Sequence, residues 1–331
     1  MTEDARFHAT LAALTLLAAG LFMASVLTGP AGLAFGESLR ALAGGENEAA
    51  RLVMQEIRLP RAILGALIGA TLGLTGAALQ GLLRNPLAEP GLLGVSAGAS
   101  LGAVLAIYTG LSAVFALALP LAALAAAAVA TGVVIGLAAG GSALTLILAG
   151  VAVSSLCGAL VSLALNLSPN PFAALEAVFW MLGSLADRSW DHVRLAAPFM
   201  LLGWTLLWGT GRSLDRLTLG EEAAASMGVA VGRLRLRVAL ATALSVGAAT
   251  AVAGAIGFVG LVAPHLLRRV VGARPSRLVP AAALAGTSIL LAADVTARLI
   301  APTRDLKLGV LTALVGAPFF LRLVLQARDR P

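Results

Sequence analysis

Very few ionisable side chains lie inside the apolar stretches of this sequence, and Asp294 and Arg298 are the clearest of them. They are four residues apart, so on a helix they share one face with the acid N-terminal to the base, the favourable order. An ionisable group within a membrane costs at least about 2.5–3.5 kcal/mol and marks a candidate functional site. Two interpretations remain open: a structural ion pair near the outer end of a membrane span, or an outward-facing Arg298 contact that Asp294 positions.

Other catalytic or metal-binding patterns are absent from the sequence. His8, His192 and His265 are scattered without metal-ligand spacing, and no Ser-His-Asp or paired-carboxylate arrangement can be defended. For His265 we expect a structural role at a helix end. A phosphate-binding loop needs Gly-x4-Gly-Lys-Ser/Thr, and this string does not occur. We therefore predict no catalytic residue, metal site or cofactor in this chain, and any ATP and Mg²⁺ must be bound by another subunit.

The most informative polar stretch covers residues 218–230. Thr218 and Glu221 have the spacing of a capping box, and Glu221 and Glu222 suit the positive end of a helix dipole. Gly228 suits a helix stop. The pattern predicts a short helix on the inner face of the membrane, which is either an ordinary connection or a docking element for a cytoplasmic partner.

The composition shows what kind of molecule must position these residues. Of 331 residues, 59% are hydrophobic and 12% charged, against roughly 25% charged in soluble domains. The mean hydropathy is +0.96, and Cys157 has no partner for a disulfide. The net charge of +7 comes from basic residues between apolar runs, so we interpret them as cytoplasmic loop charges and predict no nucleic-acid binding. The chain is therefore expected to be an all-α polytopic membrane protein, with residues 1–331 forming a single transmembrane domain.

Apolar runs of membrane-spanning length predict about ten transmembrane helices. They are Ala9–Leu27, Ala62–Leu83, Leu92–Ile107, Ala113–Ala139, Ala143–Leu165, Leu195–Trp208, Val238–Ile256, Gly257–Leu267, Leu278–Val295 and Leu308–Leu325. The first run is longer than a signal peptide and follows acidic residues, so we expect it to be retained. Most of the 23 basic residues fall on one side of this topology, which predicts that both termini are cytoplasmic.

Glycines spaced by four recur within these runs and predict close helix packing in lipid. They are Gly65, Gly69 and Gly73, then Gly98 and Gly102, then Gly132, Gly136 and Gly140. Residues 172–182 follow two prolines and predict an additional helix at the outer interface.

Several motifs together resemble the FecCD-type permease subunits of ABC importers for iron chelates (siderophores and heme) and cobalamin, over about residues 50–325. These motifs are RLPR at 58–61, QGLLRNPLAEPGLLGVS at 80–96, LGEE at 219–222, MGV at 227–229, GFVGLVAPH at 257–265 and GAPFF at 316–320. The resemblance implies pseudo-symmetric halves, a homodimer in the lipid of the cytoplasmic (inner) membrane, two cytoplasmic ATPase subunits and an extracytoplasmic substrate-binding protein.

The resemblance also assigns roles to residues of this sequence. It implies that Arg58 and Arg298 dock the binding protein, and that the helix near 218–230 couples to the ATPase through Leu219, Gly220, Glu221, Glu222, Met227 and Gly228. It implies an inner gate at Gly140, Gly141, Ser142, Ala143 and Leu144, and a translocation path lined by Ser154, Ser155 and Ser162. We expect a ferric siderophore as substrate, with heme or cobalamin as alternatives. An ion-coupled secondary carrier is a weaker hypothesis because intramembrane charge is scarce, and the broken spans and the capped inner helix argue against a membrane scaffold without transport.

Overall fold

The computed structural model describes residues 3–115, 117–302 and 304–328, and within these ranges the chain is helical without strands. The longer helices are α1 (Glu3–Leu27), α4 (Leu59–Leu83), α5 (Val95–Tyr108), α6 (Ala118–Leu137), α7 (Ala143–Asn166), α9 (Trp190–Leu207), α12 (Val231–Ala253), α13 (Val259–Val271), α14 (Pro275–Ile300) and α15 (Leu308–Arg328). The shorter ones are α2 (Phe35–Leu42), α3 (Glu48–Leu52), α8 (Pro171–Met181), α10 (Gly211–Leu217) and α11 (Glu221–Ser226). A π-helical segment, Val53–Arg58, joins α3 to α4, and 3₁₀ turns cover Pro90–Leu93 and Leu111–Ala113.

Six helical stretches in the described residues are long and apolar enough to cross a bilayer, which makes this a multi-pass membrane protein. They are Glu3–Leu27, Glu48–Leu83, Ala118–Leu137, Ala143–Asn166, Val231–Ala253 and Pro275–Ile300. Helices also occupy the four other predicted runs, but α5 and α13 are short and α9 contains polar residues in its first turn. The count of ten spans therefore stays a prediction.

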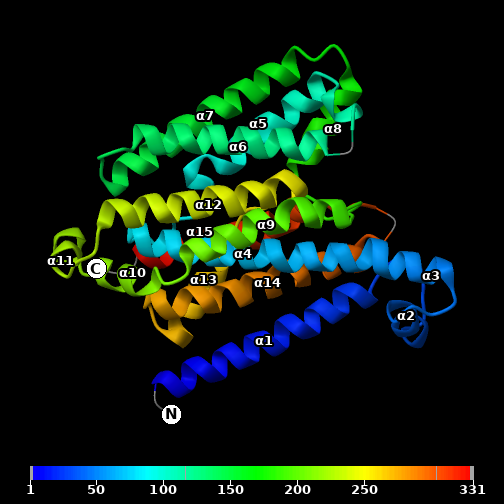
Figure 1. Cartoon of the computed structure of the whole chain (residues 1–331), viewed down its shortest axis with the longest axis horizontal. Coiled ribbons are helices and arrows are strands. Elements are labelled where there is room, and N and C mark those ends of the chain that lie inside the picture. Colours follow the sequence, from blue (N-terminus) through cyan, green and yellow to red (C-terminus); the bar gives the residue numbers. More distant parts are fainter. Residues whose placement is uncertain (1–2, 116, 303, 329–331) are drawn as a thin grey trace.

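The long helices run lengthwise through the bundle, which gives the molecule two distinct ends (Figure 1). The start of α1 lies at the same end as α10 and α11, whereas α2 and α3 lie at the opposite end (Figure 1). The short α8 also lies toward that opposite end and packs against α5. It matches the predicted additional helix, starting one residue earlier than expected. Its depth in the membrane stays a prediction.

Helices α4 and α14 form the tightest pair at the centre of the bundle because their backbones meet at glycines. A Cβ added to Gly69 would lie 2.5 Å from the carbonyl oxygen of Gly286, and one added to Gly73 would lie 1.9 Å from that of Ala282. Gly102 allows α5 the same approach to α6, since its Cβ would lie 2.3 Å from the Ala122 oxygen. The small-residue prediction is confirmed for these helices.

The prediction of close helix packing at glycines spaced by four is wrong for part of α6. A Cβ on Gly132 or Gly136 would meet nothing within 4 Å in this chain, so these glycines support no close helix contact inside the subunit. Gly140 differs again, because its φ of +71° places it in the left-handed region that glycine favours. Spacing alone therefore identified candidate packing glycines without separating inward from outward faces.

Candidate functional site

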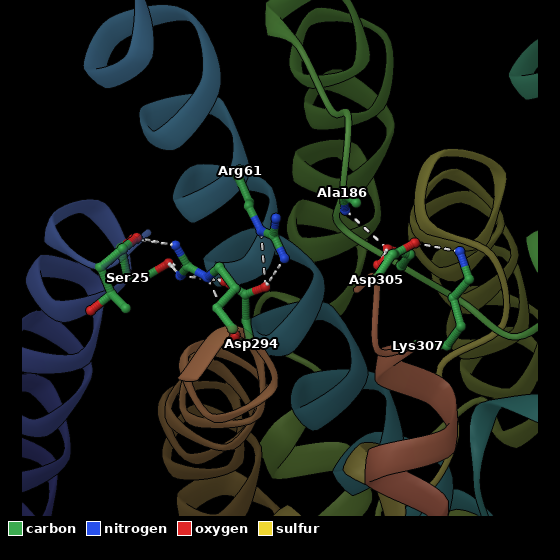
Figure 2. A network of polar contacts seen from close by, with 9 residues as sticks. Ser25, Arg61, Ala186, Asp294, Asp305 and Lys307 are labelled. Carbon is green, nitrogen blue, oxygen red and sulfur yellow. Dashed lines mark hydrogen bonds and ion pairs between the residues drawn. The ribbon is translucent and has the colours of Figure 1, made fainter. Parts of the chain in front are cut away.

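Asp294 of α14 is the centre of a buried ion cluster where α14 meets the end of α1 and the start of α4 (Figure 2). Its carboxylate is 0% exposed and accepts hydrogen bonds from two arginines on different helices. Arg61 of α4 donates to Oδ1 through Nε at 3.0 Å and Nη2 at 2.8 Å, and Arg298 donates to Oδ2 at 2.6 Å. The hydroxyl of Ser25 on α1 also donates to Oδ2, at 3.3 Å. The predicted Asp294–Arg298 ion pair is confirmed, and Arg61 and Ser25 are partners that sequence reasoning missed.

Two arginines of this region also bind the C-terminal end of α1, where backbone carbonyls lack partners within the helix. Arg298 donates to the carbonyl oxygens of Ser25 and Thr28 at 2.9 and 2.5 Å, and Arg58 donates to that of Leu27 at 2.9 Å. Cations here also suit the negative end of the helix dipole. The arginines thus fix the end of α1 to α4 and α14.

Neither predicted docking arginine projects from the surface of this structure. Arg58 is 4% exposed, and the side chain of Arg298 is 9% exposed. Arg58 closes the π-helical segment and packs so tightly on Gly29 that a Cβ there would lie 2.7 Å from its Nε. Both guanidiniums are occupied by partners within the chain, so a docking role, which stays a prediction, requires these contacts to open.

A second polar cluster ties the turn before α15 to the loop after α8 (Figure 2). Ser184 donates its hydroxyl to Oδ1 of Asp305 at 2.8 Å, and Lys307 binds Oδ2 of the same carboxylate. Burial raises the pKa of Asp305, but the hydrogen bonds from Lys307 and Ser184 outweigh it and hold that pKa below its ordinary value. The carboxylate therefore stays charged at neutral pH and fixes the turn.

At the opposite end of the bundle, α11 corresponds to the predicted short helix but starts differently. The predicted capping box is wrong, because the Thr218 hydroxyl donates to the Asp215 carbonyl at 2.7 Å and so completes α10. The residue before α11 is Gly220, with φ +113°. The predicted stop is confirmed: Gly228 has φ +82°, and its N–H donates to the Ala225 oxygen at 2.9 Å.

The predicted gate turn lies beside this helix. Ser142 caps α7 through a reciprocal pair of hydrogen bonds with Thr145, at 3.2 and 3.3 Å, and Leu144 is 62% exposed. A cavity of about 630 Å³ separates the turn from the start of α11, and residues of both segments line it: Arg84, Ser142, Ala143, Leu144, Leu219, Gly220, Glu221, Glu222 and Ala223. The structure therefore brings together two segments that lie about 80 residues apart, to which the family resemblance gives separate roles in coupling and gating.

Arg235 joins the same two segments directly, and sequence reasoning had counted it only as a loop charge. Its Nη1 donates to the carbonyl oxygen of Gly141, and its Nη2 donates to both carboxylate oxygens of Glu221 at 3.1 and 3.4 Å. The tripeptide Arg-Leu-Arg at 233–235 gave no signal to separate this arginine from its neighbour Arg233, which is exposed.

The three serines assigned to the translocation path all lie on α7, at different depths. Ser155 and Ser162 are exposed and seven residues apart, so they share the face that α7 turns away from its own subunit. Ser154 is half-buried toward α5. Their role in a translocation path stays a prediction.

The sequence predicts that His265 lies at a helix end, and this prediction is wrong because His265 lies in the middle of α13. Helix α13 continues to Val271, and the imidazole packs edge-on against Phe319 of α15 with ring centroids 5.4 Å apart. In the described residues no group of three or more His, Cys, Asp or Glu side chains could hold a metal ion.

Comparison with known proteins agrees with these features. The chain is 40% identical over 190 residues to the hemin transport system permease HmuU of Yersinia pestis, covering 57% of each chain. It is 40% identical over 185 residues to the Fe(3+) dicitrate permease FecD of Escherichia coli (56% and 58% covered), and 38% identical over 185 residues to the vitamin B12 permease BtuC of Vibrio vulnificus (56% and 55%). The matched segment thus spans little more than half the length of these curated relatives.

A solved structure matches over nearly the whole chain. It is described as an inward-facing conformation of a metal-chelate type ABC transporter, and it superposes with a TM-score of 0.85 at 33% identity, covering 96% of this chain and 98% of the other. The family model for the FecCD transport family matches residues 15–326. The chain therefore belongs to the FecCD transport family.

Proposed function

We propose that this chain is the membrane-spanning permease subunit of an ATP-driven importer that delivers a ferric siderophore to the cytoplasm by alternating access. The observation that carries the proposal is that the start of α11 and the 140–144 turn line one cavity and are joined by Arg235, in a chain of this family. Heme and cobalamin are alternative substrates, since relatives at similar identity are named for hemin and vitamin B12. The choice of siderophore reflects how common that substrate is in the resembled family.

The proposed assembly contains two copies of this chain in the cytoplasmic membrane, with both termini cytoplasmic. Two ATPase subunits bind below, where residues on either side of α11 offer exposed apolar contacts: Leu219 is 69% exposed and Met227 40% exposed. ATP and Mg²⁺ belong to those subunits. The exposed faces of the two α7 helices, with Ser155 and Ser162, would line a path on the two-fold axis that the 140–144 turns close.

A binding protein would deliver the substrate at the α2–α3 end. Arg58 and Arg298 are proposed docking residues, and acidic partners would have to compete with the contacts to α1 described above. Arg298→Glu would place a second carboxylate beside buried Asp294, so the conservative Arg298→Lys is the better test of docking. We expect weaker binding-protein affinity, and unchanged affinity would remove the docking role. Because lysine cannot reproduce every hydrogen bond that Arg298 makes to the end of α1, the thermal transition is recorded alongside to show that the variant is folded.

Uptake in cells lacking the gene tests the proposed function directly. Labelled ferric siderophores, heme and cobalamin are compared, and we expect selective loss of siderophore uptake that the intact gene restores. Selective loss of heme or cobalamin uptake would replace the substrate and keep the importer. Uptake that is abolished by an uncoupler but independent of any ATPase would instead identify an ion-coupled carrier and contradict the proposal.

Disrupting α11 should separate ATP hydrolysis from transport. Proline at Ala225, an exposed position in the second turn, removes a backbone donor and clashes with the carbonyl four residues earlier, at a cost of about 3 kcal/mol to the helix. We expect Ala225→Pro to lower uptake at least about tenfold. Proline at Glu221 is less informative, because the first helical position tolerates it. Ala225→Ser is the matched control, and normal uptake by the proline variant would remove the coupling role of α11.

A further inference from the structure

One guanidinium contacts both the start of α11 and the 140–144 turn. Arg235 lies in the second turn of α12, and its side chain is 13% exposed. One of its terminal nitrogens donates to the Gly141 carbonyl and the other donates to the Glu221 carboxylate. Glu221 is the first residue of α11, and Gly141 directly precedes the Ser142 cap of α7. Arg235 therefore links three helices through polar contacts of one guanidinium.

Two cavities lie beside this link. A cavity of about 540 Å³ lies where the three segments meet, and Gly140, Gly141, Glu221 and Arg235 all line it. A second cavity separates Ser142 and Leu144 from the start of α11. Among the hydrogen bonds of the described residues, only those of Arg235 connect the 140–144 turn with Glu221. Arg235 is therefore the hydrogen-bonded connection between α11 and the turn.

The chemistry of the contact requires arginine. Its planar fork presents two nitrogens in fixed directions and so binds a carboxylate and a carbonyl together, whereas lysine offers a single point charge. The third nitrogen, Nε, is buried and has no hydrogen-bond partner in the described part of the chain. Buried donors are normally paired, so this conformation leaves Arg235 incompletely satisfied. An unsatisfied donor beside an open cavity is the arrangement of a side chain that can exchange partners when α11 moves.

We propose that Arg235 is the positioning residue that transmits movement of α11 to the 140–144 turn. The inference rests on the proposed function, because it assumes that a partner ATPase moves α11. The ion pair holds Arg235 to α11, and the bond to Gly141 then carries a shift of α11 to the N-terminal cap of α7. Without Arg235, α11 still docks on the ATPase, but its movement no longer changes the position of the turn.

The test uses the full complex with its ATPase subunits, reconstituted in lipid vesicles. Arg235→Gln removes the ion pair with Glu221, and Arg233→Gln is the matched control, because Arg233 is exposed two residues away on the same helix. We expect the Arg235→Gln complex to co-purify with the ATPase and to hydrolyse ATP at a rate within about twofold of the parent. Uptake should fall about tenfold, because losing charge-assisted hydrogen bonds has an effect of about this size. Arg233→Gln should retain both activities.

A direct readout follows the turn itself. Leu144→Cys in a Cys157→Ala background places one exposed thiol on the turn, and its labelling rate by a maleimide is measured with and without ATP. We expect ATP to change the rate several-fold in this parent and in Arg233→Gln, and to leave it unchanged in Arg235→Gln. A purely structural role for Arg235 would lower the yield of complex without removing the response to ATP.

The outcomes separate this inference from the proposed function. If no ATPase co-purifies with the parent chain, the proposed function fails. If ATPase and uptake are coupled in the parent and Arg235→Gln behaves like Arg233→Gln, only the role of Arg235 is overturned. If Arg235→Gln fails to assemble, Glu221→Gln is used instead, because it breaks the same ion pair from the α11 side. A normal ATP-dependent labelling response in Glu221→Gln would equally overturn the inference.

Discussion

Replacing Asp294 with alanine is expected to lower the free energy of unfolding by about 3–5 kcal/mol, because removing one partner of a buried ion cluster leaves uncompensated charge. The carboxylate is fully buried, and the side chains of Arg61 and Arg298 that it neutralises are 18% and 9% exposed. Without it, two guanidiniums face each other at the junction of α1, α4 and α14. Thermal and denaturant unfolding of the purified chain in detergent measure the loss.

An exposed ion pair in the same chain provides the control. Asp191 and Arg194 are 3.4 Å apart, and their side chains are 62% and 76% exposed. Exposed pairs contribute about 0–1 kcal/mol, so Asp191→Ala should leave the unfolding transition nearly unchanged. Equal stability losses in the Asp191 and Asp294 variants would show that the buried cluster does not hold these three helices together.

The ion cluster also shows what the sequence could predict at this site. The Asp294–Arg298 contact follows from a local rule, since residues four apart on a helix face each other. Arg61 lies 233 positions away from Asp294 in sequence, and its place in the cluster depends on how α4 crosses α14. The two arginines that the family resemblance directs outward are held inside by the carbonyls at the end of α1, a tertiary contact that no local pattern contains.

The region around α11 shows the same division between local and long-range information. Gly228 was recognised as the end of α11 because its left-handed conformation is a local property of glycine. The start was misassigned, since Thr218 completes the preceding α10 instead of capping α11. Arg235 carried no local signal at all, because its two partners come from a helix and a turn that only the folded chain brings together.

Replacing Gly73 with alanine is expected to force α4 and α14 apart and so to destabilise the centre of the bundle. The added Cβ would lie 1.9 Å from the Ala282 carbonyl oxygen and 2.7 Å from its carbonyl carbon, and both are backbone atoms of α14 that cannot rotate away. Helices α4 and α14 must therefore separate, which also disturbs the neighbouring contact of Gly69 with Gly286. Overpacking of this kind costs about 1–3 kcal/mol and occasionally more, and backbone contacts belong at the upper end.

Gly132→Ala is the matched control, because a Cβ at that position meets nothing within 4 Å in this chain, and alanine is the better helix former by about 1 kcal/mol. We expect Gly73→Ala to lower the unfolding temperature and the yield of folded protein in detergent, and Gly132→Ala to leave both unchanged or raised. The opposite order would show that the close approach of α4 and α14 does not limit stability. A loss confined to Gly132→Ala would instead place a helix of another subunit against α6, since within its own chain that face of α6 is open.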